Sequence, residues 1–234
     1  MIGPMKRILI FLTFLPLILN ARVYTFSGGE DNTVMLIASK VLQKAYAKAG
    51  LEMKPLFLPL EESLQRSNSG QTDGELVRIK KITQAYPNLR QVPVEIMSVE
   101  AIAFSKNTAL VINNWSDLHG HKVTIVKGTK FIEHATKDIP KEVVLSFKEA
   151  FEALRQDKTE ILVIPKLAGL RLYYMNQYDN IKPVSSALTR LSLYHFVHKK
   201  NIHLLPIMTP VLKEMKQSGE IDYIRQSYLR NVTR

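Results

Sequence analysis

The amino-acid sequence predicts an α/β protein with largely parallel sheets. Strand-like and helix-like segments alternate along almost all of the 234 residues, as expected when helices connect parallel strands. The extended segment 92–104 is rich in β-branched residues and long enough to leave one sheet and enter another. No Pro/Gly/Ser linker interrupts the chain, so two lobes would be joined by crossing strands.

The first half begins with a strand and a helix with clear boundary signals. Gly28 and Gly29 turn the chain, and Asn32 or Thr33 can cap a helix whose apolar residues keep a helical period up to Gly50. The expected elements are a strand over 22–27, this helix, a strand over 53–58, a short helix over 61–68, a strand over 74–79 and the extended segment 92–104.

In the second half, short strands alternate with helical patterns. Ser146 and Glu149 form a capping box ahead of an apolar face that includes Phe147 and Phe151. Gly219 separates the last two helices. The expected strands cover 123–126, 143–145, 161–164, 181–184 and 191–197, and the final helices cover 204–215 and 221–228.

Residues 1–21 predict a secretory signal peptide. Lys6 and Arg7 precede an apolar run over 8–19, and Ala21 is a small residue at a cleavage point. This run is shorter than the ~20 residues that span a bilayer, so a cleaved leader is preferred over an uncleaved anchor. The chain has no cysteine, and therefore no disulfide framework and no acceptor for a lipid anchor. We expect a protein of the periplasm of a Gram-negative bacterium.

The chain is basic, with a formal net charge of +11 that is dispersed along the sequence. This charge favours an anionic ligand or an anionic envelope surface through long-range attraction. Nucleic acid is excluded as a partner by the export signal and by the absence of a helix-turn-helix, zinc-finger or RNA-binding motif. The histidines show no metal-ligand spacing, and no motif indicates a cofactor.

The segment 115–129 predicts a strand-to-helix junction. A short helical turn over 115–118 and a reversal at Gly120 lead into the strand 123–126, and Gly128-Thr129 steps into another helix. The first turn of a helix has N–H groups without internal partners, and its dipole attracts carboxylate or phosphate. In an exported protein, such free donors favour binding of a small solute over its chemical conversion.

The order of several motifs resembles the type II periplasmic solute-binding proteins, in the family 3 or amino-acid-type branch. The matching residues are Gly70-x-x-Asp73-Gly74 with Arg78, Trp115-x-Asp117-Leu118-x-Gly120-x-x-Val123 leading to Gly128-Thr129, and Leu193-Tyr194-His195 with Gly219-x-Ile221. The resemblance implies two α/β lobes that close on a ligand cleft about two crossing strands. Lobe one would comprise 22–104 plus 192–234, and lobe two 105–191.

The resemblance also implies a ligand site. Arg78 would hold a carboxylate with its planar guanidinium, helped by backbone donors of Gly128 and Thr129. Pro165 stands where many members have a carboxylate for the ligand's amine. A small anion or polar molecule other than an ordinary α-amino acid is therefore also expected. The remaining candidates, chosen from their positions near strand ends and the hinge, are Ser27, Phe26, Glu75, Ser105 and Tyr194. An aromatic residue at the position of Phe26 is more often in the core than in a cleft wall. Thr129 is expected both to cap its helix and to contact the ligand, and Arg78 could equally be a surface residue.

The expected function is non-catalytic. A monomer would capture a small polar, anionic or amino-acid-like ligand by hinge closure and present it to an ABC importer permease or a membrane sensor. Two alternatives stay open. An enzyme on the same fold, dehydratase- or lyase-like, would need a buried carboxylate with a raised pKa, for which Glu75 and Glu160 are the candidates. A ligand-less envelope interaction scaffold would have a cleft lined by apolar or mismatched groups.

Overall fold

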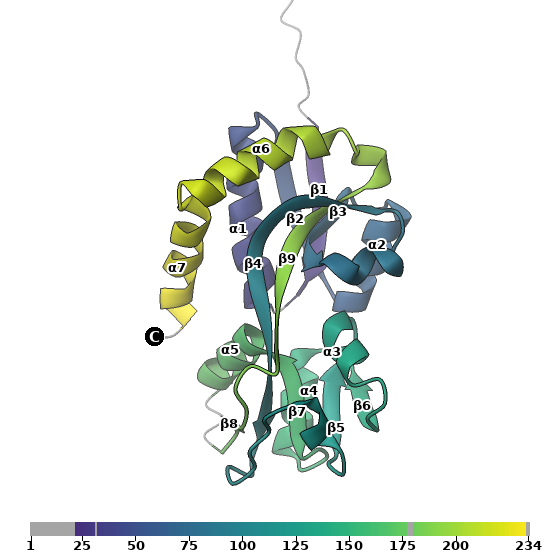
Figure 1. Cartoon of the computed structure of the whole chain (residues 1–234), viewed down its shortest axis with the longest axis vertical. Coiled ribbons are helices and arrows are strands. Elements are labelled where there is room, and N and C mark those ends of the chain that lie inside the picture. The colour runs from purple at the N-terminus through teal and green to yellow at the C-terminus, as the bar shows by residue number, and fades with distance from the viewer. Residues whose placement is uncertain (1–21, 31, 177–179, 233–234) are drawn as a thin grey trace, which may run out of the picture.

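The computed structural model describes residues 22–30, 32–176 and 180–232, so the predicted signal peptide lies outside the described residues. Figure 1 shows two lobes stacked along the long axis. We call the part that contains β1 to β3 lobe one and the part that contains β5 to β7 lobe two. The long strands β4 (Leu89–Ser105) and β9 (Thr189–His198) belong to the connection between them. The predicted two-lobed α/β architecture is confirmed.

All nine strands of the described residues form one sheet in the order β2-β1-β3-β9-β4-β7-β5-β6, with β8 beside β4. Pairing is parallel among β1, β2 and β3 and among β5, β6 and β7, and antiparallel where β9 or β7 meets β4. The short strands are β1 (Val23–Gly29), β2 (Glu52–Leu58), β3 (Gly74–Ile79), β5 (Val123–Val126), β6 (Lys141–Val144), β7 (Ile161–Pro165) and β8 (Lys182–Pro183). Residues 101–104 of β4 already pair with β7, so the passage between the lobes falls inside this strand.

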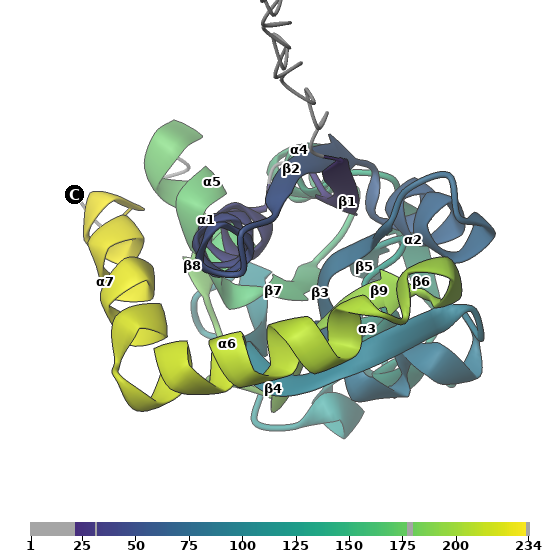
Figure 2. The same cartoon turned by 90° about the horizontal axis from the view of Figure 1, so that it is seen from above.

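The helices begin at the caps that the sequence indicates. The side chain of Asn32 accepts a hydrogen bond from the Val34 N–H at 3.0 Å, and Ser146 accepts one from the Glu149 N–H at 3.1 Å. The helices are α1 (Thr33–Lys48), α2 (Leu60–Ser69), α3 (Lys130–Ala135), α4 (Phe147–Arg155), α5 (Lys166–Asn176), α6 (Leu204–Gln217) and α7 (Glu220–Val232), with 3-10 turns η1 (Lys80–Gln84), η2 (Trp115–Leu118) and η3 (Lys199–Asn201). Seen from above, α6 lies across β4 and α7 runs down one side (Figure 2).

Apolar packing continues across the seam between the lobes. One buried cluster extends from α1 in lobe one, with Leu42, through Ile102 of β4 to Phe151 of α4 in lobe two. A smaller cluster, with Ile125 and Val163, covers the other face of the lobe-two sheet. Of the helices in the described part of the chain, none has both the length and the apolar character needed to cross a membrane. Because apolar packing joins the two lobes, the seam at which their elements meet is the place to look for a functional site.

Candidate functional site

The seam between the lobes contains a small, partly open cavity of about 50 Å³. Arg78, Gly128 and Thr129, three of the predicted ligand residues, line it together with Pro165 and apolar side chains from both lobes. Ligand pockets for small molecules measure about 300–1,000 Å³. The structure therefore shows the lobes closed on each other, with room in this cavity for water-sized groups only.

Gly128 lies at a close contact between the two lobes. Its φ of +84° is in the left-handed region, and a Cβ built on it would lie 2.5 Å from the Cβ of Leu60 and 2.6 Å from the backbone nitrogen of Glu61. Both contacts cross from lobe two to α2 of lobe one. Glycine is required here for two reasons, because the backbone conformation disfavours a side chain and the opposing helix leaves no space for one.

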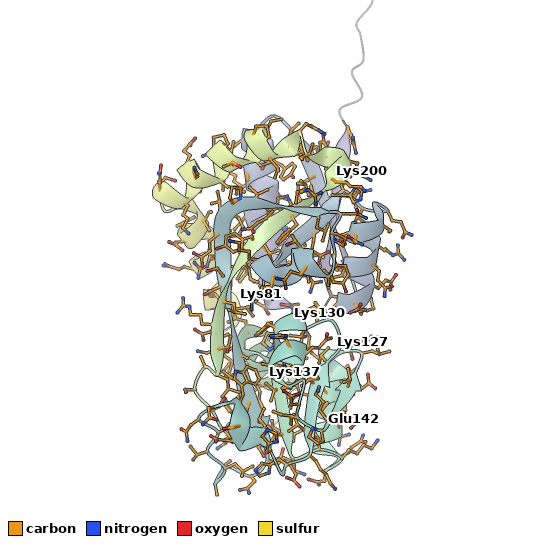
Figure 3. All side chains as sticks on the ribbon, turned by 45° about the vertical axis from the view of Figure 1, so that its right-hand side comes forward. Lys81, Lys127, Lys130, Lys137, Glu142 and Lys200 are labelled. Carbon is orange, nitrogen blue, oxygen red and sulfur yellow. The ribbon has the colours of Figure 1, made fainter. Side chains whose placement is uncertain are left out.

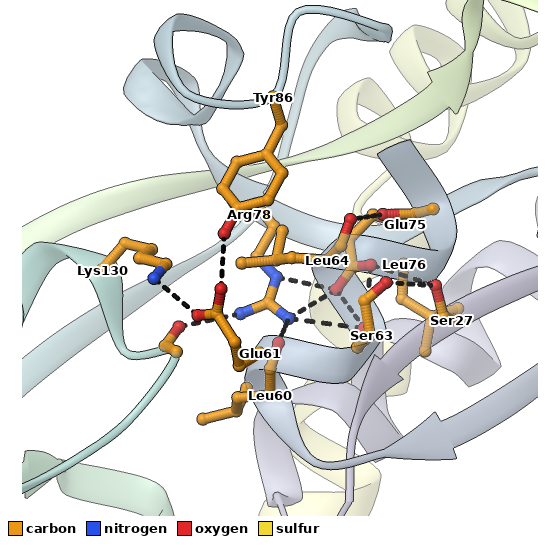
Figure 4. A network of polar contacts seen from close by, with 12 residues as sticks. Ser27, Leu60, Glu61, Ser63, Leu64, Glu75, Leu76, Arg78, Tyr86 and Lys130 are labelled. Atoms are coloured by element: carbon orange, nitrogen blue, oxygen red, sulfur yellow. Dashed lines mark hydrogen bonds and ion pairs between the residues drawn. The ribbon is translucent and has the colours of Figure 1, made fainter. Parts of the chain in front are cut away.

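Arg78 is buried and already paired with a carboxylate of the same strand. Its Nε and Nη2 lie 2.7 and 2.6 Å from Oε1 of Glu75. Nη2 also donates to the carbonyl of Leu60 at 3.1 Å, and Nη1 donates to the carbonyl of Gly128 at 3.3 Å, which ties lobe one to lobe two. Figure 4 shows the contacts of this guanidinium with Glu75, Leu60 and neighbouring groups. A ligand carboxylate would have to compete with Glu75.

Glu75 is fully buried, and its other oxygen contacts are with serines. The Ser63 hydroxyl donates to both carboxylate oxygens at 2.7 and 2.8 Å, and the Ser27 hydroxyl lies 3.1 Å from Oε2. Ser27 therefore lies behind Glu75, away from the small cavity, where it also contacts the Thr72 hydroxyl at 3.0 Å. Two predicted ligand residues, Ser27 and Glu75, thus form a support for a third, Arg78.

The expectation of free backbone donors at Gly128 and Thr129 is corrected by the structure. The Gly128 N–H donates to Oε1 of Glu133 at 2.5 Å, and the Thr129 N–H donates to the carbonyl of Val126 at 3.2 Å. The Thr129 side chain makes no capping bond, and its buried hydroxyl has no partner in the described part of the chain. The helix α3 is only six residues long, and Glu133 reaches back from it to take the position of an external anion.

An ion pair that the sequence analysis missed also joins the lobes. Nζ of Lys130, at the start of α3, lies 2.6 Å from Oε2 of Glu61 in α2 and 3.0 Å from Oε2 of Glu133. Burial would lower the pKa of Lys130, but hydrogen bonds to the two carboxylates outweigh it and raise the pKa to about 12. Burial acts to raise the pKa of Glu61, yet bonds from Lys130 and the Tyr86 hydroxyl hold it below its ordinary value. The pair is charged at neutral pH.

The other predicted ligand residues lie away from the small cavity. Ser105 is at the far end of β4, where its hydroxyl donates to the carbonyl of Glu160 at 2.7 Å. It does not border the hinge as expected, because β4 continues through lobe two. Phe26 is in the core of lobe one, with its ring centroid 4.6 Å from that of His195. Tyr194 pairs with Arg78 across the β3–β9 ladder and lines a larger groove next to the small cavity.

Neither candidate carboxylate is placed as an enzyme would need it. Glu160 is exposed, and a hydrogen bond from His121 lowers its pKa, which is the wrong direction for a general acid. The oxygens of Glu75 are engaged by Arg78 and serines. Within residues 22–30, 32–176 and 180–232, no cluster of His, Asp and Glu has the arrangement of a metal site.

Sequence comparison gives distant relatives only. The chain matches no protein-family model. An uncharacterized protein of Shewanella oneidensis is 24% identical over 197 residues, which cover 81% of this chain and 74% of that protein. A protein of Shewanella frigidimarina that is provisionally described as a sensor is 23% identical over 130 residues, covering 54% of this chain but 20% of that protein.

Solved structures share the two-lobed architecture over most of the chain. A histidine kinase sensor domain with similarity to periplasmic binding proteins has a TM-score of 0.75 at 15% identity, covering 89% of this chain and 96% of its own. An ancestral arginine-binding protein bound to arginine has a TM-score of 0.72 at 17% identity, covering 88% and 97%. The GluR0 ligand-binding core in complex with L-glutamate has a TM-score of 0.72 at 14% identity, covering 88% and 96%.

Proposed function

We propose that this chain, whose fold is that of the type II periplasmic binding proteins, is a non-enzymatic solute-binding or sensor domain of the periplasm. Its lobes would open and close about β4 and β9, and the closed form would be read by a membrane partner, an ABC importer or a sensor kinase. The structural neighbours support both kinds of partner, since they include an amino acid ABC transporter substrate-binding protein and a kinase sensor domain.

The observation that carries this proposal is the set of polar contacts across the seam. Lys130 and Glu61 pair at 2.6 Å from opposite lobes, and Arg78 reaches the Gly128 carbonyl at 3.3 Å. When the lobes separate, the two charged side chains lose each other as partners. A solute that carries both a positive and a negative charge can then pair with both side chains, so that neither is left unpaired. The closed lobes therefore hold, in their own side chains, contacts that a ligand could take over.

The charges at the seam favour a zwitterion over a simple anion. The network holds two cations, Arg78 and Lys130, and three carboxylates, Glu61, Glu75 and Glu133. A bare anion would meet an excess of negative charge at close range. An amino-acid-like solute could instead place its ammonium group on Glu61 and its carboxylate on Lys130. Because the small cavity at the seam measures only about 50 Å³, the lobes must separate for such a solute to enter.

The test is thermal unfolding of residues 22–234 with amino acids, organic acids, polyamines and small peptides. A solute that binds only the folded protein and is present at ~100 times its Kd adds about 2.7 kcal/mol of stability. We expect a zwitterionic amino acid to raise the melting temperature, Lys130→Gln to abolish the shift, and the exposed matched variant Lys137→Gln to retain it. A shift from organic acids alone, or one that Lys130→Gln retains, would contradict the assigned ligand chemistry.

The ligand-less interaction scaffold is the second candidate, and the occupied polar groups at the seam favour it. Glu75 engages Arg78, Glu133 engages the Gly128 N–H, and apolar packing crosses the seam. Small-angle X-ray scattering distinguishes the two candidates. A solute receptor should become more compact when its ligand is added, whereas a scaffold should have the same dimensions in every solution.

A further inference from the structure

A groove much larger than the cavity at the seam lies beside it. Its volume is about 620 Å³, which is in the range of small-molecule sites. Its walls come from both lobes, with the end of β3 and η1 on one side and α3 on the other, and residues of β9 line it between them. The groove adjoins the small cavity, with which it shares Ile79, Ile82, Lys130 and Phe131, but Arg78 does not line it.

The groove combines an apolar lining with a cationic rim. Ile79, Ile82, Phe131 and Leu191 supply apolar surface, and Tyr194 adds an aromatic ring. The cationic or titratable side chains that line it are Lys80, Lys81, Lys130 and His134, and no aspartate or glutamate lines it. Figure 3 shows Lys81 and Lys130 on one face of the molecule, close to the seam.

Two of these cations are available to a ligand without breaking an existing ion pair. Lys80 and Lys81 are exposed, and neither is within ion-pair distance of a carboxylate in the described residues. Lys130, by contrast, is engaged by Glu61 and Glu133. An anionic group at the η1 side of the groove would therefore gain charge-assisted contacts directly.

We propose that this groove is a second binding site, for a small amphipathic molecule with a hydrocarbon or aromatic body and one carboxylate. The body would lie on Ile82, Phe131 and Leu191, and the carboxylate would contact Lys80 and Lys81. Such a ligand satisfies both parts of the lining, because its body removes apolar surface from water while its charge remains at the exposed rim. Since the two walls belong to different lobes, an occupant would also hold the lobes at a fixed angle.

The test is isothermal titration calorimetry of the purified protein with decanoate and, as an uncharged match, 1-decanol. We expect decanoate to bind and decanol to bind at least tenfold more weakly. The double variant Lys80→Glu/Lys81→Glu should weaken decanoate at least tenfold, and Ala135→Trp, which fills the groove from α3, should abolish binding. The exposed residue Lys137 does not line the groove, so Lys137→Glu is the control and should leave the Kd unchanged within twofold.

Three results would overturn the proposal. Decanoate and decanol could bind equally, in which case the groove recognises no charge. The double variant and Lys137→Glu could weaken decanoate equally, in which case the effect is one of overall charge. No heat of binding for decanoate at millimolar concentration would also reject the site. The substituted lysines are exposed, so their replacement should leave the melting temperature unchanged. Measuring the melting temperature of each variant will show that it remains folded.

Discussion

Oε1 of Glu75 lies within 2.7 Å of both Nε and Nη2 of Arg78, so a carboxylate of the same strand fills the guanidinium fork. Residues three apart on a regular strand point to opposite faces of the sheet. Here the β3–β9 pairing changes register between Glu75 and Arg78, and the irregularity brings both side chains to one side. The pairing thus depends on one local departure from regular strand geometry.

Removing Arg78 should be strongly destabilising. Arg78→Ala leaves the buried Glu75 carboxylate without its cation, and breaking a buried pair in this way costs about 3–5 kcal/mol. The half-exposed pair of Arg66 and Glu62 supplies the control, since Arg66→Ala should cost at most about 1 kcal/mol. Urea unfolding measures both values. Equal costs for the two variants would show that Glu75 does not depend on Arg78.

Substitution of Gly128 should open the lobes. Gly128→Ala adds a Cβ that would lie 2.5 Å from Leu60 across the seam. Gly120→Ala is a closely matched control, because its φ of +83° imposes nearly the same backbone strain as the +84° of Gly128 but nothing lies within 4 Å of its Cβ. Both variants should lose about 1–2 kcal/mol from backbone strain. Only Gly128→Ala should increase the radius of gyration in small-angle scattering, and identical scattering curves would contradict lobe contact at this residue.

The protein should lose stability in weak acid because of His195. Burial lowers the pKa of this fully buried imidazole from 6.5 to about 4. Its Nδ1 faces two carbonyls and its Nε2 faces the Tyr46 hydroxyl, so the neutral form with a proton on Nδ1 fits the site. Between pH 6.5 and pH 4 the unfolded chain binds more protons than the folded one, so stability falls as the pH falls.

The expected loss from His195 is about 2 kcal/mol on going from pH 8 to pH 5. Chemical unfolding at the two pH values measures it in the wild type, in His195→Gln and in the control His119→Gln, which alters an exposed histidine. Replacement of His195 should remove this part of the pH dependence, and the control should retain it. A pH dependence that His195→Gln leaves intact would assign the acid sensitivity to other groups.

The ion pair of Lys130 and Glu61 should be energetically coupled across the seam. Both side chains are largely buried, so a double-mutant cycle with Lys130→Ala and Glu61→Ala should give about 1 kcal/mol of coupling. A cycle on the exposed pair of Lys106 and Asp157 should give a value near zero. Coupling that disappears when the lobes are opened by Gly128→Ala would show that the pair forms only in the closed state.

The sequence predicted the fold well because the fold depends on periodic burial and helix caps. Asn32 and Ser146 begin α1 and α4 where their side chains indicated, and the long segment around 92–104 is the crossing strand β4. The structural matches confirm the predicted resemblance to type II periplasmic binding proteins at the level of fold. Each of these features is encoded locally in the chain.

The candidate site was predicted only in part because its contacts are not local. Arg78, Gly128 and Thr129 do meet at the seam, but the partners that satisfy them come from an irregular strand register and from a helix of the opposite lobe. Glu61 and Lys130 are 69 positions apart in the numbering of the chain, and no pattern links them. An ion pair between two closed lobes can be recognised only from the three-dimensional structure.

The two-stranded connection between the lobes has a mechanical consequence. β4 and β9 remain hydrogen-bonded to each other from Leu89 to Ala101, so the lobes are joined by a ladder and no loose hinge loop lies along this stretch. Rotation of one lobe against the other must twist these two paired strands. The strands therefore resist rotation and favour one angle between the lobes. The register shifts near Glu95 lie where β9 also pairs with β3, and the two-stranded stretch from Ser98 to Glu100 is regular. The stiffness of these two strands would then set how much work any occupant must do to hold the lobes together.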